Sequence, residues 1–103
     1  MEAATPTVKF FGVPHDAPAL TTMVQPEYTP EALKAGIEGT VMIYVEVGTD
    51  GRAHRPRVVK GLGYGLDAKT LAALEQWRFI PAKRNGVAVV CSATVEINFR
   101  RPR

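Results

Sequence analysis

The sequence predicts an α+β domain built from a small sheet and two short helices. An alternating apolar stretch at 40–47 runs into Gly48-Thr-Asp-Gly51, a pattern typical of a strand followed by a tight hairpin. A second reversal, Asn85-Gly86, precedes another alternating stretch at 89–99. Two further segments carry helix start and stop signals. A chain of 103 residues has room for one such domain.

Residues 40–47 form the predicted central strand. Strand side chains alternate between the two faces, and one face here is wholly apolar, with Val41, Ile43, Val45 and Val47. The other face is also mostly apolar, at Met42 and Tyr44, which favours a strand with neighbours on both sides. The hairpin should then return the chain at once into residues 52–60.

Residues 52–60 are predicted to form one edge of the sheet. Pro56 cannot donate a hydrogen bond to a ladder, so it suits an edge or a bulge. The charged side chains of this stretch would protect that edge against unwanted pairing. A nucleic-acid-binding stripe is the alternative interpretation of these cations, although the aromatic side chains that single-stranded nucleic acid binders use are missing here. The charged residues are Arg52, Arg55, Arg57 and Lys60.

Residues 1–23 are expected to form a partly ordered extension before a domain at 24–103. Three prolines in this segment argue against a long helix, and Val8 to Phe11 either add a strand or lie over the core. The first helix is predicted at 30–35. Thr29 can cap it, Pro30 suits its first turn, and Gly36 can end it in the left-handed conformation.

The second helix is predicted at 68–77, with Asp67 as its N-cap. Its apolar stripe, which should pack on the sheet, consists of Leu71, Leu74 and Trp77. Ile80 stands before Pro81 and is pushed toward extended geometry, so the helix should end near Arg78.

Residues 89–99 are predicted to form the third strand and the other edge of the sheet. Cys91 lies in the apolar register and should be buried and inert. The strand contains no proline and few charges, which is unusual for an edge, and an open edge of this kind invites an extended peptide to join the sheet. The residues on its other face are Val90, Ser92, Thr94, Glu96 and Asn98.

Catalytic, metal and cofactor sites are not predicted. His15 and His54 have no evident carboxylate or nucleophile partner in a recognisable motif, and no second pair of ligands stands at a metal-like spacing. The loop Gly61-Leu-Gly-Tyr-Gly65 does not have the spacing of a phosphate-binding or dinucleotide-binding loop and is interpreted as a connector. No apolar run approaches the roughly 18 residues of a membrane span, and a signal peptide pattern is absent, which indicates a cytoplasmic protein or an excised domain.

Several short motifs, in a fixed order, carry a resemblance to a known family. They are Pro26-Glu-Tyr28, Gly36-Ile-Glu-Gly-Thr-Val41, Asp50-Gly-Arg52, Leu66-Asp67, Trp77-Arg-Phe-Ile-Pro-Ala82, Asn85-Gly86 and Ile97-Asn-Phe99. Over residues 24–100 the chain resembles the carboxy-terminal domain of the TonB family. Many family members read Gln-Pro-x-Tyr-Pro, whereas here Thr29 separates Tyr28 from Pro30.

The resemblance implies a three-stranded antiparallel sheet with two helices packed on one face. It also implies a periplasmic domain of an inner-membrane-anchored protein that grips the TonB box, an extended segment of outer-membrane transporters, and transmits force through the partners ExbB and ExbD. The family's membrane anchor and proline-rich spacer are not in this chain. The peptide would add beside the third strand, with Gln25, Pro26 and Tyr28 forming a neighbouring wall.

Two alternatives to this transport role are left open by the sequence, and in any of these roles a pair of chains could exchange strands to form a homodimer. The first alternative is a domain of another envelope protein, such as a sensor peptidase, because similar domains occur on such proteins. A basic nucleic-acid-binding module would use the cations of residues 52–60 together with Lys83, Arg84 and the tail at 100–103. Because phosphate binding weakens steeply with salt, salt dependence would separate that module from strand addition, and we expect no nucleic-acid partner.

Overall fold

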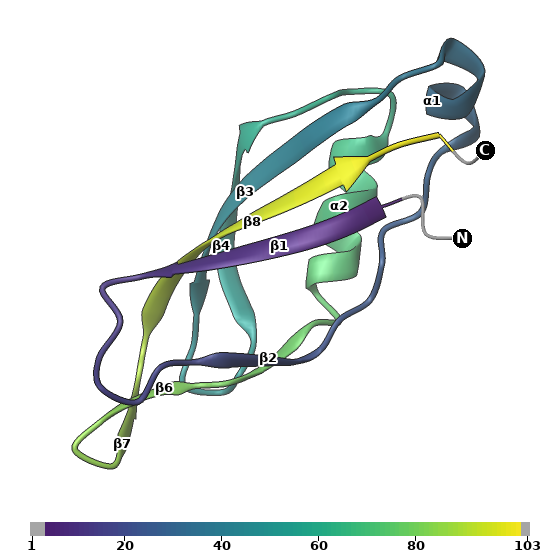
Figure 1. Cartoon of the computed structure of the whole chain (residues 1–103). Helices are drawn as coiled ribbons and strands as arrows, with labels where there is room; N and C mark the ends of the chain where they lie inside the picture. Colours follow the sequence, from purple (N-terminus) through teal and green to yellow (C-terminus); the bar gives the residue numbers. More distant parts are fainter. Residues whose placement is uncertain (1–3, 102–103) are drawn as a thin grey trace.

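The structure is a computed structural model that describes residues 4–101 (Figure 1). The elements of these residues are, in order, β1 (Ala4–Phe11), β2 (Ala19–Thr22), α1 (Pro30–Ala35), β3 (Gly39–Val47), β4 (Ala53–Lys60), α2 (Leu66–Leu74), β5 (Arg78–Ile80), β6 (Ala82–Arg84), β7 (Val87–Val89) and β8 (Cys91–Phe99). The α+β class predicted from the sequence is confirmed.

The main sheet has four strands in the order β1-β8-β3-β4, and not the three that were expected. All neighbours in it are antiparallel. The additional strand is β1, from the segment before residue 24, where the sequence left a strand and a covering segment as alternatives. Two small ribbons, β2-β5 and β6-β7, complete the fold.

Strands β3 and β8 form the centre of the sheet and supply most of the core. They pair without interruption from Gly39 opposite Phe99 to Val47 opposite Cys91. Alternate residues of both strands are buried, because side chains of a strand point to opposite faces in turn. The buried set is Val41, Ile43, Val45, Val47, Cys91, Ala93, Val95, Ile97 and Phe99.

The hairpin between β3 and β4 forms where the sequence predicts it. Gly51 has φ +77°, a backbone conformation that glycine adopts without the steric cost of a Cβ atom. The N–H of Gly48 donates to the carbonyl of Arg52 over 2.9 Å and closes the turn. Strand β4 is an edge, as predicted, and its pairing with β3 shifts register at two places.

Helix α1 has the predicted bounds and caps. The Thr29 hydroxyl accepts from the N–H of Ala32 over 3.2 Å, and Gly36 ends the helix with φ +69°. Figure 1 shows α1 beyond the end of β3 and β8, whereas α2 lies against one face of the main sheet.

Helix α2 begins and ends earlier than predicted. Its N-cap residue is Gly65, with φ +78° and no side-chain cap, so the assignment of Asp67 as N-cap was wrong. The Asp67 carboxylate accepts instead from the backbone N–H groups of Leu62 and Gly63, and it thereby fastens the preceding loop to the helix. Trp77 lies beyond the end of the helix and is fully buried.

The predicted strand 89–99 is divided in the structure. The chain leaves β7 at Val89, and Val90 separates it from β8. Figure 1 shows the β6-β7 hairpin projecting from one end of the fold, next to the start of β8. The separation means that Val90 is not part of the strand that enters the main sheet.

Candidate functional site

The strand predicted to be an open edge is not at the edge of this sheet. β8 pairs with β3 on one side and with β1 on the other, from Ala4 opposite Phe99 to Phe11 opposite Ser92. The prediction that β8 is unpaired was therefore wrong. It failed because the alternation of a strand shows which side chains share a face, but does not show how many strands pair with it.

The backbone groups of β8 that face β1 can be identified by alternation. Successive residues of an antiparallel strand direct their N–H and C=O groups alternately to the strand on one side and to the strand on the other. Because the N–H of Gly48 donates to Arg52, the even-numbered residues of β3 face β4 and the odd-numbered ones face β8. The even-numbered residues of β8 then face β1. These are Ser92, Thr94, Glu96 and Asn98, four of the five strand residues predicted to bind a peptide.

Side chains of these four residues lie on the face of the sheet opposite the core, where each is half-buried. The Tyr44 hydroxyl of the neighbouring strand donates to the Ser92 hydroxyl over 2.8 Å. Val90, the fifth predicted residue, is 58% exposed at the bend before β8. It is therefore placed at one end of the β8 lane, by which we mean the side of β8 that β1 occupies.

Of the three predicted wall residues, Tyr28 lies at the opposite end of β8 from Val90. Gln25 and Pro26 lie beside α2, where they line a surface hollow together with Ala72, Ala73 and Gln76. The Tyr28 ring packs edge-on against Phe99, with ring centroids 5.4 Å apart. Pro26 is buried, and the Gln25 side-chain nitrogen is buried without a hydrogen-bond partner among residues 4–101. Phe99 and Ser92 are seven residue positions apart, or about 23 Å along the strand, so Tyr28 borders one end of the β8 lane only.

Burial raises the pKa of Tyr28, with the nearby Glu38 carboxylate adding to the rise and Arg101 opposing it. The Tyr28 hydroxyl donates to the backbone carbonyl of Ile37. The start of this segment is held as well, because the indole N–H of Trp77 donates to the carbonyl of Val24 over 2.8 Å. Sequence reasoning placed Trp77 in the core but did not identify this bond, since no local pattern indicates a contact across 53 residues.

Cations of β4 and the chain end are partly engaged within the fold. The guanidinium of Arg57 lies over the Tyr44 ring at 5.5 Å, Arg55 is 4.0 Å from Glu46, and Arg101 is 3.6 Å from Glu38. The first two contacts use side chains of the neighbouring strand β3. This arrangement is typical of a solvated, charge-protected edge and provides little support for a phosphate-binding stripe.

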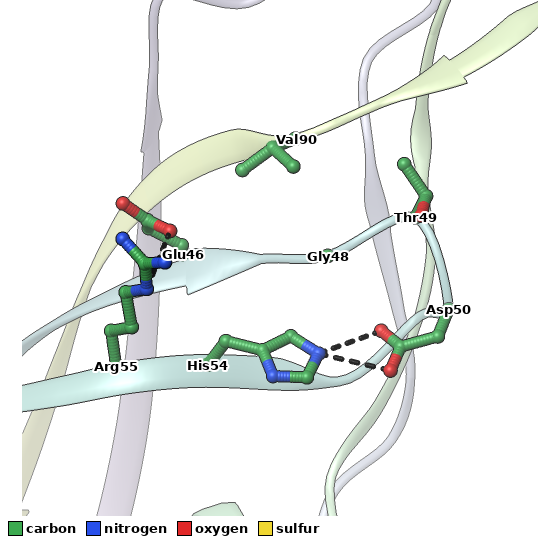
Figure 2. Close-up of a pocket in the computed structure, with 7 residues that line it drawn as sticks. All are labelled: Glu46, Gly48, Thr49, Asp50, His54, Arg55 and Val90. Carbon is green, nitrogen blue, oxygen red and sulfur yellow. Dashed lines mark hydrogen bonds and ion pairs between the residues drawn. The ribbon is translucent and has the colours of Figure 1, made fainter.

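A surface pocket of about 380 Å³ lies at the β3-β4 hairpin (Figure 2). His54 Nε2 is 2.9 Å from both carboxylate oxygens of Asp50, so His54 has the carboxylate partner that sequence analysis did not find. The histidine bond, followed by the backbone N–H of Arg52, holds the pKa of Asp50 below its usual range. Figure 2 shows Glu46 and Arg55 on one side of this pair and Val90 across the pocket.

The hairpin pocket has little of what a hydrolytic site requires. Both members of the His54–Asp50 pair are about half exposed, and the pocket lining offers the Thr49 hydroxyl but no thiol or serine hydroxyl. No hydrogen bond joins Thr49 to His54 among those found in the described residues. Within the described part of the chain, three or more metal-ligating side chains do not come together. A helix long and apolar enough to cross a membrane is also absent from residues 4–101.

Comparison with known proteins identifies the relatives of the chain. Residues 24–100 match the family described as Gram-negative bacterial TonB protein C-terminal. The chain is 37% identical over 87 residues to Protein TonB of Vibrio cholerae, covering 82% of this chain and 36% of that protein. It is 37% identical over 76 residues to Protein tonB2 of Pseudomonas aeruginosa, covering 73% of this chain and 28% of that protein.

A solved structure agrees with these relatives. The fold is similar to the solution NMR structure of the Pseudomonas aeruginosa TonB CTD, with a TM-score of 0.68 and 25% sequence identity over 86% of this chain and 90% of that one. The chain spans about a third of the length of the curated relatives it matches, or less. These relatives do not favour a sensor peptidase or a nucleic-acid-binding module.

Proposed function

The chain belongs to the TonB family, of which residues 24–100 are the carboxy-terminal domain, and from this premise we propose that it is the periplasmic receptor-binding domain of an energy transducer. It binds the TonB box, an extended segment of an outer-membrane transporter, by strand addition and so supports active transport. The domain acts by binding and not by catalysis. In this role the domain would work together with an inner-membrane anchor and with the partners ExbB and ExbD.

The proposal rests on one observation about the strands of the main sheet. The matched residues 24–100 include β3, β4 and β8, but β1 lies before them. Taken by themselves, these matched strands would leave one side of β8 without a neighbour. That side is long and regular, and β8 contains no proline, which is the combination that an added strand needs.

The proposed binding site is the β8 lane together with the segment that borders it. Backbone groups of Ser92, Thr94, Glu96 and Asn98 would pair with the peptide, and Val90 would lie at one end. The segment from Gln25 to Tyr28 would form the wall near Phe99, where Tyr28 already packs. The affinity then arises chiefly from main-chain hydrogen bonds, and side chains of the wall select the sequence.

The test is a titration of an isotope-labelled full chain with a TonB-box peptide, followed by amide chemical shifts. We expect the largest shifts in β1, in β8 and at residues 25–28, and similar affinity at low and high salt. A scrambled peptide of the same composition is the control. Shifts confined to residues 53–60, with binding lost at high salt, would contradict strand addition and support attraction to the basic edge.

A second copy of the chain is the competing occupant of the same lane, through strand exchange. The molecular mass in solution, measured over a range of protein concentrations with and without peptide, separates the two. A dimer that dissociates as peptide is added would indicate that a partner chain and the peptide use one site. A monomer at all concentrations leaves the peptide as the only occupant from outside the chain.

A further inference from the structure

We propose that β1 is an exchangeable strand that occupies the transporter-peptide site and has to leave β8 before the peptide can bind. The inference rests on the proposed function and adds a regulatory step to it. Figure 1 shows β1 alongside β8 over the whole length of β1. The pairing runs from Ala4 to Phe11, eight residues, and covers the backbone positions assigned to the peptide.

Both free edges of the main sheet are poor sites for another strand. The outer edge of β4 carries Pro56 and Arg55, which has φ +51°, and its pairing with β3 shifts register twice. The outer edge of β1 carries Pro6. Pro6 stands opposite Ile97, an odd-numbered residue that faces β3, so by alternation the missing N–H of Pro6 lies on the solvent side of β1. The regular, proline-free edge is the side of β8 that β1 covers.

β1 is held less firmly than the strands at the centre of the sheet. Its side facing the core has one buried residue, Ala4, whereas Pro6, Val8 and Phe10 are half-buried. Every core-facing residue of β8 is buried. Outside the ladder, β1 is held by the edge-on contact of Phe10 with Phe79, 6.2 Å between ring centroids, and by the Cys91 thiol, which donates to the Phe11 carbonyl over 3.2 Å. Removing β1 therefore exposes less apolar surface than separating β3 from β8.

The side chains of β1 also indicate which peptides the site accepts. Alternate residues face the core and are apolar, and the intervening ones, Thr5, Thr7 and Lys9, are exposed. A replacing peptide therefore needs an extended stretch of about eight residues with apolar side chains at every second position. The position of Ala4, which is 2% exposed beside Phe99, requires a small side chain. The position of Phe10, next to Phe79, has room for a large one.

A reversible covalent lock tests whether β1 has to leave. Val8 and Val95 are directly opposed, at a Cα separation that a disulfide can bridge, about 4.5–5.5 Å for such pairs. The variant carries Val8→Cys and Val95→Cys in a Cys91→Ala background. The oxidised form should bind the TonB-box peptide at least about tenfold more weakly than the same protein after reduction. The disulfide holds β1 on β8, so no fraction of the protein has the β8 lane free for the peptide. Equal binding by both forms would overturn the inference.

A pair of alanine variants tests the same idea in the opposite direction. Phe10→Ala removes the contact with Phe79 and loosens β1, so the affinity for the peptide should increase several-fold. Phe11→Ala is the matched control, because Phe11 is the next residue and is 43% exposed on the other face. A decrease in affinity on Phe10→Ala would show that β1 supports peptide binding and does not compete with it.

Two measurements that do not use the TonB-box peptide keep the inference separate from the proposed function. Amide hydrogen exchange of the parent protein should be faster in β1 than in β3. A synthetic peptide with the sequence of residues 4–11 should bind to the β8 lane of the reduced variant but not to that of the oxidised one. If this peptide exchanges and the TonB-box peptide does not bind, the proposed function fails and the exchangeable strand stands. If β1 amides exchange as slowly as those of β3 and neither peptide enters, the exchangeable strand is wrong.

Discussion

Tyr28 and Phe99 pack edge-on, with ring centroids 5.4 Å apart and planes at 79°, and this pair joins the segment before α1 to the end of β8. The Tyr28 hydroxyl also donates to the carbonyl of Ile37, so one side chain connects three parts of the fold. The contact places the wall of the proposed peptide site against the last residue of the strand that the peptide would join. Tyr28 therefore contributes to stability as well as to the proposed site.

Tyr28→Phe should reduce the free energy of unfolding by about 0.5–1.5 kcal/mol, because it removes the hydroxyl and leaves the Ile37 carbonyl without that donor. Tyr28→Ala should cost more, since it also removes the ring contact with Phe99. Urea unfolding of the three proteins measures both steps. Equal stabilities of the parent and the phenylalanine variant would show that the hydrogen bond makes no net contribution.

Trp77→Ala should reduce the free energy of unfolding by about 3–5 kcal/mol, as is usual when a fully buried aromatic side chain is truncated. Trp77 packs near Phe79 and its indole N–H donates to Val24, so the loss affects both the core and the start of the 24–28 segment. Tyr64→Ala, at a position that is 52% exposed, is the control and should change little. A loss below about 1 kcal/mol for Trp77→Ala would contradict this packing.

Gly51→Ala should destabilise the protein more than Gly86→Ala. Both glycines have nearly the same backbone conformation, with φ +77° and +79°, so the cost of the left-handed conformation, about 1–2 kcal/mol, is shared. A Cβ atom on Gly51 would clash with the carbonyl oxygen of Phe79, whereas a Cβ on Gly86 meets nothing within 4 Å. The difference between the two unfolding free energies isolates that contact. Equal losses would mean that the backbone near Phe79 can move aside without cost.

The Asp50–His54 pair predicts a specific loss of stability in acid. The folded-state pKa of Asp50 is lowered, so its ionised form contributes stability that is present above its ordinary pKa, near 4, and is lost as the pH falls through the folded value. Asp50→Asn lacks this contribution. The difference in Tm between parent and variant should therefore decrease between about pH 5 and pH 2. A difference that stays constant over this range would exclude a role for the ionised carboxylate.

Most of the fold was predictable from local patterns, because those patterns act over a few residues. The α1 caps at Thr29 and Gly36, the β3-β4 hairpin at Gly51 and the edge position of the strand with Pro56 all follow from the conformational preferences of single residues. The bounds of α2 were less accurate. Asp67 satisfies backbone N–H groups of the preceding loop and not those of the helix end, a choice that depends on the path of the loop.

Which strand pairs with the outer side of β8 was not predictable in the same way. β1 pairs with a strand more than 80 residues away, and its own sequence, with Pro6 and only partly buried apolar residues, gives a weak strand signal. The candidate site was affected in turn. Sequence alternation grouped Ser92, Thr94, Glu96 and Asn98 on one face, but it could not show that their backbone groups already have a partner.

Substitutions at Thr94 separate backbone pairing from side-chain recognition in the proposed site. Thr94 lies near the middle of the β8 lane, opposite Lys9. Thr94→Val keeps the size of the side chain and the N–H group, so the affinity for a TonB-box peptide should change by less than about threefold. Thr94→Pro removes an N–H that faces the lane and not β3, so the variant can keep its core ladder while peptide binding falls by tenfold or more.

Two measurements accompany the proline variant. Circular dichroism and the amide spectrum establish that Thr94→Pro is folded. Val58→Pro in β4 is the matched control on the opposite edge of the sheet, because Val58 stands opposite Ile43, which faces β8, so the Val58 N–H points away from β3. A folded Thr94→Pro protein that binds the peptide as tightly as the parent would show that the peptide does not pair with β8. Loss of binding in Val58→Pro alone would place the peptide on the β4 edge, where its attraction to Arg55 and Lys60 should weaken with salt.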